Sequence, residues 1–248
     1  MKQETDFIFG IRAVLEAIRS GKEIDKVLML KGLSGELFQE LFSEIKSCNI
    51  LFSYIPDEKL NRITRKNHQG VIAFISPITY HSLENLIPSL FEQGKTPFLL
   101  MLDSLTDVRN IGAIARTAEC AGVHAIIIPE KGFGQINADA VKTSAGALHY
   151  MPFCRVKSLV NTVKYLKDCG IQVISATEKA NKDYFMAKLT EPLAIILGAE
   201  DTGISPDLLR LSDSLFRIPI LGQIESLNVS AAASVMMYEV VKQRMRPV

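Results

Sequence analysis

The spacing of hydrophobic residues predicts alternating helices and strands over the first third of the chain. Apolar side chains at helical spacing predict helices at residues 11–18 and 37–45, and a polar helix or turn follows at residues 57–67. Short apolar runs predict strands at residues 27–30, 50–55 and 71–75. Alternating elements of this length indicate a small α/β domain.

The rest of the chain has longer apolar runs between helical segments. These runs predict strands at residues 98–102, 125–129, 173–175, 194–197 and 216–220. A helix is predicted from Asp107 to about Gly122, so the first two strands form a βαβ unit with parallel pairing. Because the strands are almost continuously apolar, we expect an α/β fold whose sheet is covered by helices on both faces.

Prolines mark the boundary between the two parts. Pro77 and Pro97 flank a short helical pattern at residues 83–91, and Pro88 lies within it. The predicted regions are an N-terminal domain at residues 1–77, a linker with the first helix of the next domain at 78–96, and a C-terminal domain at 97–248.

Composition restricts the classes of partner. The 248 residues are 48% hydrophobic and carry a formal net charge of +1, so a nucleic-acid partner would need a local basic patch. The four cysteines, Cys48, Cys120, Cys154 and Cys169, lack C-x-x-C spacing, which argues against a zinc site and a disulfide framework. The N-terminus lacks the apolar core of a signal peptide, and no apolar run is long enough to span a bilayer. We therefore expect a soluble cytoplasmic protein with no metal and no membrane partner.

One face of the predicted helix at residues 107–122 carries basic side chains. Arg109, Gly112 and Arg116 are spaced i, i+3 and i+7, so they share that face. Gly112 is expected to leave open surface between the two guanidinium groups, near a helix N-terminus that favours anions. An interior glycine costs helix stability, which favours an anion site over the alternative of two arginines on a solvated face.

A second candidate segment begins where the predicted strand at residues 194–197 ends. Gly198 is followed by Glu200 and Asp201, and then by Gly203. Ligands of open α/β sheets bind outside the carboxyl ends of strands, and a glycine there lets a flat ligand approach the backbone. The two acidic residues fit a ligand site and a simple turn equally well.

The last strand and helix provide a third candidate segment. A short apolar strand at residues 218–221 is predicted to run into Gly222, and Ser226 and Asn228 then lie where a helix begins. Side chains of these types accept hydrogen bonds from the free N–H groups at a helix start. The small residues at 230–234 keep this helix thin, so that another segment can lie close to it. We expect this passage to close a ligand pocket.

The sequence lacks the common nucleotide-binding motifs but contains one local basic cluster. No G-x-G-x-x-G motif follows the first strand of either half and there is no P-loop, which disfavours dinucleotide enzymes and nucleotide hydrolases. Arg62, Arg65 and Lys66 form a basic cluster before the strand at residues 71–75. This cluster is either a solvated helix face or a patch that contacts phosphates.

Three segments together resemble the signature motifs of the SpoU family of RNA ribose 2′-O-methyltransferases, within the SPOUT (trefoil-knotted) superfamily. They lie in family order at residues 102–118, 197–205 and 218–230. Residues 9–14 and 68–71 resemble the RNA-substrate domain of the branch that modifies a guanosine in large-subunit ribosomal RNA. The chain departs from the family at Ile220, where Met is more frequent, and at Val108, where Pro is common.

The resemblance implies S-adenosylmethionine as the cofactor, bound in a C-terminal SPOUT domain with a parallel sheet and a deep trefoil knot. The residues implied to hold the cofactor through backbone groups are Leu197, Gly198, Ile218, Ile220 and Leu227. A homodimer is implied as well, with the RNA site near the subunit junction, and the small N-terminal α/β domain is implied to bind RNA. Within that domain we assign RNA contacts to Arg62, Arg65 and Lys66.

The resemblance assigns catalysis to Arg116. A guanidinium is a poor base, so we expect Arg116, with Arg109 nearby, to hold the adjacent phosphate and to stabilise the developing oxyanion. The residues implied to orient Arg116, the ribose or the cofactor are Asn110, Glu200, Ser226 and Asn228, with helix capping as the alternative for the last two. The expected reaction is methyl transfer to a guanosine 2′-hydroxyl in 23S rRNA. A tRNA ribose methyltransferase and a non-catalytic RNA-binding assembly factor are the alternatives.

Overall fold

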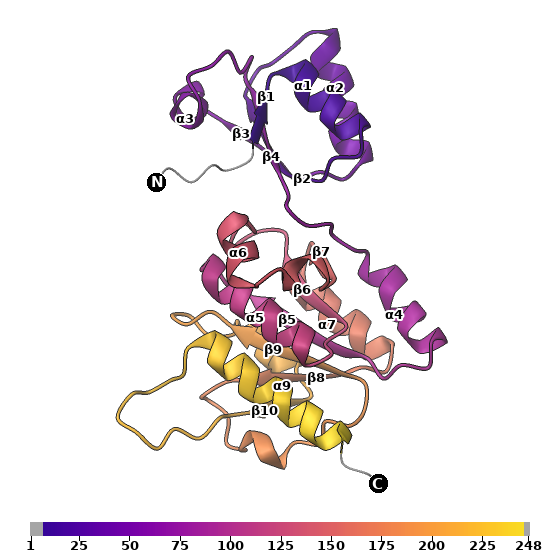
Figure 1. Ribbon diagram of the computed structural model, residues 1–248, viewed down its shortest axis with the longest axis vertical. Coiled ribbons are helices and arrows are strands. Elements are labelled where there is room, and N and C mark those ends of the chain that lie inside the picture. Colours follow the sequence, from indigo (N-terminus) through magenta and orange to yellow (C-terminus); the bar gives the residue numbers. More distant parts are fainter. Residues whose placement is uncertain (1–6, 246–248) are drawn as a thin grey trace. The chain divides into compact units, whose positions relative to one another are not determined.

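The computed structural model describes residues 7–245 of the chain. The chain divides into two compact units, one ending at Ile78 and the other starting at Thr79 (Figure 1). Each unit has its own sheet and its own buried core.

The first unit is built on a four-stranded sheet with strand order β1-β4-β2-β3. Its elements are β1 (Phe7–Phe9), α1 (Ile11–Arg19), β2 (Ile24–Leu30), α2 (Glu36–Ser47), β3 (Phe52–Ile55), α3 (Asp57–Ile63) and β4 (Val71–Ile75). Val14 of α1 and Leu41 of α2 are buried on one face of the sheet, and Leu60 of α3 is buried on the other. The predicted helices and strands are confirmed here, except that the strand predicted from residue 50 begins at Phe52 and that β1 was not predicted.

The two short segments that resemble an N-terminal substrate domain meet at the start of α1. The Gly10 N–H donates to the Val71 carbonyl at 3.0 Å, and the Ile11 N–H donates to Gln69 Oε1 at 3.2 Å. Gln69 therefore binds one of the free N–H groups of a helix start. Gly10 has a φ of 91°, a conformation that glycine adopts readily, and this lets β1 turn directly into α1.

The second unit is built on a six-stranded sheet with strand order β10-β8-β9-β5-β6-β7. Its elements are α4 (Leu83–Glu92), β5 (Phe98–Asp103), α5 (Val108–Cys120), β6 (Ala125–Pro129), α6 (Ala138–Thr143), β7 (Phe153–Val156), α7 (Leu159–Asp168), β8 (Gln172–Ala176), β9 (Leu193–Gly198), α8 (Pro206–Leu211), β10 (Ser214–Phe216) and α9 (Val229–Met245). Neighbouring strands all pair in parallel, which confirms the parallel α/β sheet.

Helices cover both faces of this sheet (Figure 1). On one face, Ile87 of α4, Val163 of α7 and Leu208 of α8 belong to a single buried cluster. Side chains alternate between the faces of a strand, and α5 and α9 lie side by side over the other face. Ile111 and Ala115 of α5 are fully buried there.

The strand predicted at residues 216–220 is wrong beyond its first residue. β10 ends at Phe216, opposite Ala176, where its partner strand β8 also ends. Pro219 has no N–H for a sheet bond, and residues 218–228 contain no helix or strand. The apolar run at 218–221 therefore has no strand to pair with, and Leu221 is 98% exposed.

Candidate active site

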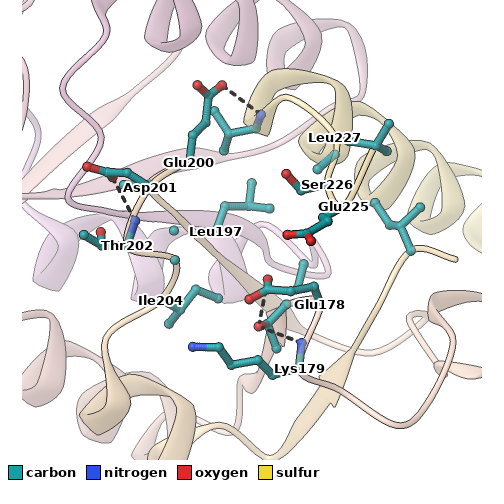
Figure 2. Close-up of a pocket in the computed structure, with 18 of the residues that line it drawn as sticks. Glu178, Lys179, Leu197, Glu200, Asp201, Thr202, Ile204, Glu225, Ser226 and Leu227 are labelled. Atoms are coloured by element: carbon teal, nitrogen blue, oxygen red, sulfur yellow. Dashed lines mark hydrogen bonds between the residues drawn. The ribbon is translucent and has the colours of Figure 1, made fainter. Parts of the chain in front are cut away.

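A cavity of about 310 Å³ lies at the carboxyl ends of β8 and β9. Its walls come from residues 176–179 at and beyond the end of β8, residues 197–204 at the end of β9 and in the turn after it, and residues between 218 and 232 that include the start of α9 (Figure 2). This is the edge of a parallel sheet where ligands bind. The segment predicted from Gly198 therefore does reach a cavity.

The five residues predicted to hold a cofactor all line this cavity. They are Leu197, Gly198, Ile218, Ile220 and Leu227. Leu197 is buried at the end of β9, whereas Ile220 and Leu227 are 38% and 41% exposed. Ser226 lies among them, and its side chain makes no hydrogen bond within residues 7–245. Ser226 thus has a place in the cavity wall, and the capping alternative for it has no support.

A close backbone approach explains Gly198. A Cβ atom at this position would lie 2.2 Å from the carbonyl carbon of Gly203. Gly203 has a φ of 68°, and its N–H donates to the Ala199 carbonyl at 2.9 Å. The chain therefore folds back directly on the end of β9, and a side chain on Gly198 would prevent it.

Asn110, Glu200 and Asn228 bond to one another beside the cavity. Asn110 Nδ2 donates to Glu200 Oε1 at 3.1 Å. Asn228 Nδ2 donates to Asn110 Oδ1 at 3.1 Å and also to Glu200 Oε1. These residues belong to α5, the turn after β9 and the residue before α9, so the fold joins one side chain from each of the three sequence segments. Glu200 also lines the cavity.

Asn228 combines helix capping with this network. Its Oδ1 accepts the N–H of Ser230 in the first turn of α9 at 2.9 Å, while its Nδ2 is used by the network. Glu200 Oε1 accepts the Val229 N–H at 3.3 Å, and a helix N-terminus is a favourable place for a carboxylate. The two alternatives for Asn228 are therefore compatible with each other.

Arg109 and Arg116 are exposed on α5 and do not line the cavity. The Arg109 side chain is 78% exposed and its guanidinium lies 3.0 Å from a carboxylate oxygen of Asp107. Hydrogen bonds from the Arg109 side chain and backbone hold the pKa of Asp107 below its usual value. Arg116 makes no hydrogen bond or ion pair to any residue from 7 to 245. An external anion can therefore reach Arg116 directly, whereas it must displace Asp107 from Arg109.

The prediction that Gly112 leaves open surface between the two arginines is wrong. Gly112 is buried, and a Cβ atom there would lie 2.5 Å from the Ala140 carbonyl oxygen and 2.8 Å from Thr143 Cβ. The glycine is therefore explained by the close crossing of α5 and α6. Helical spacing could not reveal this, because it does not show which neighbour covers a face.

Gly112→Ala is expected to lower the free energy of unfolding by about 1–3 kcal/mol, as overpacking against fixed atoms does. The Ala140 carbonyl belongs to the α6 backbone and cannot move away without shifting that helix. Urea denaturation of the variant and the wild type measures the difference. Alanine is the better helix former by about 1 kcal/mol, so a gain in stability would contradict the packing explanation.

The cavity wall that follows β8 was not predicted from the sequence. Thr177, Glu178 and Lys179 line the cavity, and Thr177 Oγ1 donates to Glu178 Oε2 at 3.3 Å. A signal for them existed, because the strand predicted at residues 173–175 ends just before them and ligand sites follow strand ends. Glu225 was also missed, since it lies in the segment that was wrongly expected to follow a strand.

The predicted RNA-binding residues of the first unit are exposed. They are Arg62 in the last turn of α3, and Arg65 and Lys66 just beyond it. His68 nearby is buried: the Gly70 N–H donates to His68 Nδ1 at 3.0 Å, so Nε2 carries the proton and donates to Asn61 Oδ1 at 3.3 Å. Its role is therefore structural, while the basic cluster is available for phosphate contacts.

Within residues 7–245, no group of three or more His, Cys, Asp or Glu side chains is placed to hold a metal ion. None of the described helices has the length and apolar character needed to cross a membrane. All four cysteines are free thiols, and burial raises the pKa of Cys154 to about 12.

Models of known protein families match both units of the chain. Residues 97–238 match the model of the SpoU rRNA Methylase family, and residues 7–81 match the model described as RNA 2′-O ribose methyltransferase substrate binding. A putative TrmH family tRNA/rRNA methyltransferase, YacO of Bacillus subtilis, is 33% identical over 98% of each chain. The 23S rRNA (guanosine-2′-O-)-methyltransferase RlmB of Photorhabdus laumondii is 36% identical over 97% of this chain and 99% of its own.

Solved structures share the fold. The SpoU methyltransferase AviRb from Streptomyces viridochromogenes, crystallised with AdoMet, has a TM-score of 0.61 and 23% identity, covering 96% of this chain and 90% of that one. An AdoMet-bound rRNA methyltransferase from Sinorhizobium meliloti has a TM-score of 0.62 and 22% identity, covering 97% and 88%.

Proposed function

Since the chain belongs to the SpoU rRNA methylase family, we propose that it methylates the 2′-hydroxyl of a guanosine ribose in large-subunit (23S) ribosomal RNA. As a member of this family, it is an S-adenosylmethionine-dependent RNA 2′-O-methyltransferase. The observation that carries the substrate assignment is the 36% identity to the guanosine methyltransferase, which extends over 97% of the chain and so includes the substrate-binding unit.

The cavity beside Glu200 fits S-adenosylmethionine. Its volume of about 310 Å³ lies at the lower end of the range of small-molecule pockets. Gly198 lines the cavity at the end of β9, and the walls combine apolar side chains with charged ones. When bound, S-adenosylmethionine supplies a methyl group on a positively charged sulfur. We assign its binding to Leu197, Gly198, Ile218, Ile220 and Leu227.

In our proposal Arg116 provides the positive charge that stabilises the negative charge developing in the reaction. A guanidinium stays protonated in proteins, so it is a poor base, but its planar fork suits a phosphate. Arg116 is exposed and makes no bond within the described chain. In our proposal it holds the phosphate next to the target ribose and stabilises negative charge as the 2′-hydroxyl loses its proton. Arg109 contributes a second, weaker contact.

The network of Asn110, Glu200 and Asn228 orients the reacting groups. Their mutual hydrogen bonds fix the direction of each amide and carboxylate beside the cavity. Held side chains contribute to catalysis through positioning, which alone can account for several kcal/mol of a barrier. In our proposal the Ser226 hydroxyl, which lies in the cavity wall, helps to orient the reacting groups.

We further propose a homodimer, with the RNA site near the subunit junction. Leu221 and Ile224 are 98% and 77% exposed before α9, and Tyr238 on α9 is 50% exposed, so apolar surface is available for a second copy. A partner there would also account for the position of Arg116 outside the cavity of its own chain. The basic residues Arg62, Arg65 and Lys66 (exposed in the first unit) would extend the RNA contact.

A trefoil knot in the second unit is also part of the proposal. The chain leaves β10 at one edge of the sheet and returns to its middle, where α9 packs on α5 and β9. The slim start of α9 supports a close crossing, because Ala233 is fully buried, although Ala231 is exposed.

The free cysteines suit our further proposal of a reducing cytoplasmic location.

The test is transfer of tritiated methyl groups from S-adenosylmethionine to 23S rRNA and to tRNA in separate reactions. We expect incorporation into rRNA, with mass spectrometry locating the methyl group on a guanosine 2′-oxygen. Incorporation into tRNA alone would replace the proposal by a tRNA ribose methyltransferase. Incorporation into neither RNA, with the cofactor bound, would favour a non-catalytic RNA-binding assembly factor.

A further inference from the structure

Two carboxylates project into the cofactor cavity from different segments. Glu178 follows β8, and Glu225 precedes α9. Figure 2 shows both side chains directed into the cavity near Leu197 and Ser226. Glu178 accepts a hydrogen bond from Thr177, and Glu225 has no hydrogen bond or ion pair within residues 7–245.

The charged groups of the cavity are mostly acidic. The carboxylates in its lining are Glu178, Glu200, Asp201 and Glu225, and the one ammonium in the lining is that of Lys179. Glu200 is already bonded to two asparagine side chains and a backbone N–H. Asp201 Oδ1 accepts the N–H of Thr202 at 2.9 Å. Glu225 is unbonded within residues 7–245, Glu178 is held only by the 3.3 Å bond from Thr177, and both point into the cavity, so these two carboxylates are best placed to act on a ligand.

The reaction changes the charge of the ligand in this cavity. Methyl transfer breaks a sulfur–carbon bond, forms an oxygen–carbon bond and releases the hydroxyl proton. The sulfur recovers its electron pair and becomes a neutral thioether, so the product S-adenosylhomocysteine carries one positive charge fewer than the cofactor. The adenosine part and the ammonium and carboxylate of the amino-acid part are the same in both.

We propose that Glu178 and Glu225 make the cavity select S-adenosylmethionine over S-adenosylhomocysteine. Negative side chains attract the sulfonium and not the thioether. Glu178 and Glu225 are exposed, so the attraction is moderate and depends on the short distance at which a ligand in the cavity lies. The product is thus bound less tightly than the cofactor and leaves more readily. This inference rests on the cofactor use of the family and requires no particular RNA substrate.

The test is isothermal titration of the full chain, without RNA, by S-adenosylmethionine, S-adenosylhomocysteine and sinefungin, which has an amine-bearing carbon in place of the sulfonium. We expect the wild type to bind the cofactor about tenfold more tightly than the product, which corresponds to about 1.4 kcal/mol. Glu178→Gln and Glu225→Gln should each lower this ratio roughly threefold, and the double variant should bring it near one. The affinity for sinefungin should fall in the variants as the affinity for S-adenosylmethionine does.

The control variant is Glu92→Gln, which removes one exposed carboxylate outside the cavity and should leave the ratio unchanged. Thermal unfolding of each variant shows whether the fold is kept. Equal affinity of the wild type for cofactor and product would overturn the inference while leaving the cofactor site intact. An equal loss of both affinities in the variants would overturn it too, because the carboxylates would then contact the part that the ligands share. Failure of the wild type to bind any of the three ligands would instead reject the cofactor cavity itself.

Discussion

Replacing Arg116 by alanine is expected to lower methyl transfer to RNA by at least about a hundredfold, the usual effect of losing one group that stabilises a developing oxyanion. Affinity for S-adenosylmethionine should stay nearly unchanged, because Arg116 lies on α5 and does not line the cavity. Single-turnover transfer of tritiated methyl groups measures the first quantity and isothermal titration the second. The expected result is a separation between a lost reaction and a retained cofactor.

Arg109 provides the matched control on the same helix. Its guanidinium is paired with Asp107, so Arg109→Ala removes a charge that is partly satisfied within the chain and should reduce transfer less than Arg116→Ala. Arg116→Lys keeps the charge but loses the planar fork, and should recover only part of the rate. Loss of cofactor binding in Arg116→Ala would contradict this division of roles.

The sequence motifs identify three side chains that the fold brings together. Glu200 and Asn228 lie 90 and 118 positions after Asn110 in the sequence, and the structure joins all three by hydrogen bonds. Residues at the ends of parallel strands meet at one edge of a sheet, so the cavity beyond Leu197 and Gly198 follows from the order of strands and helices. Pattern alone does not show what Arg116 binds, and within residues 7–245 its side chain makes no hydrogen bond or ion pair.

Short strands were the least predictable part of the fold. β1 and β10 have three residues each and β7 has four, which is too short for an apolar run to stand out. Their pairing depends on neighbours that are distant in sequence, as in the pairing of Phe7 with Phe74. The opposite error occurred at residues 218–221, where an apolar run suggested a strand although β8 had already ended at Ala176.

At two glycines, too, the sequence does not show which neighbouring atoms come close. Gly112 was expected to expose surface and is buried instead, because α6 lies against it. Gly198 was expected to let a ligand approach the backbone, and the closest atoms are those of Gly203. A missing side chain indicates that something comes close, but the sequence does not say whether it is a ligand or another segment of the chain.

Gly198→Ala is therefore expected to damage both the fold and the cofactor site. A Cβ atom there would lie 2.2 Å from the carbonyl carbon of Gly203 and 2.3 Å from the nitrogen of Ile204. These are backbone atoms, and the next residue, Ser205, is held by its N–H bond to Asp103 Oδ2 at 2.8 Å, on a carboxylate that is 7% exposed. The turn cannot retreat without breaking that bond. We expect the free energy of unfolding to fall by about 1–3 kcal/mol.

Affinity for S-adenosylmethionine should fall more than about tenfold in the same variant, since the displaced turn carries Glu200 and forms one wall of the cavity. Gly222→Ala is the matched control: no atom lies within 4 Å of a Cβ atom at Gly222 and its φ is not in the left-handed region, so stability and affinity should both be kept. Thermal unfolding and isothermal titration measure the two effects separately. Unchanged affinity in a destabilised Gly198→Ala would mean that the cofactor does not depend on this turn, and the binding assigned to Gly198 would then have to move to the segment before α9.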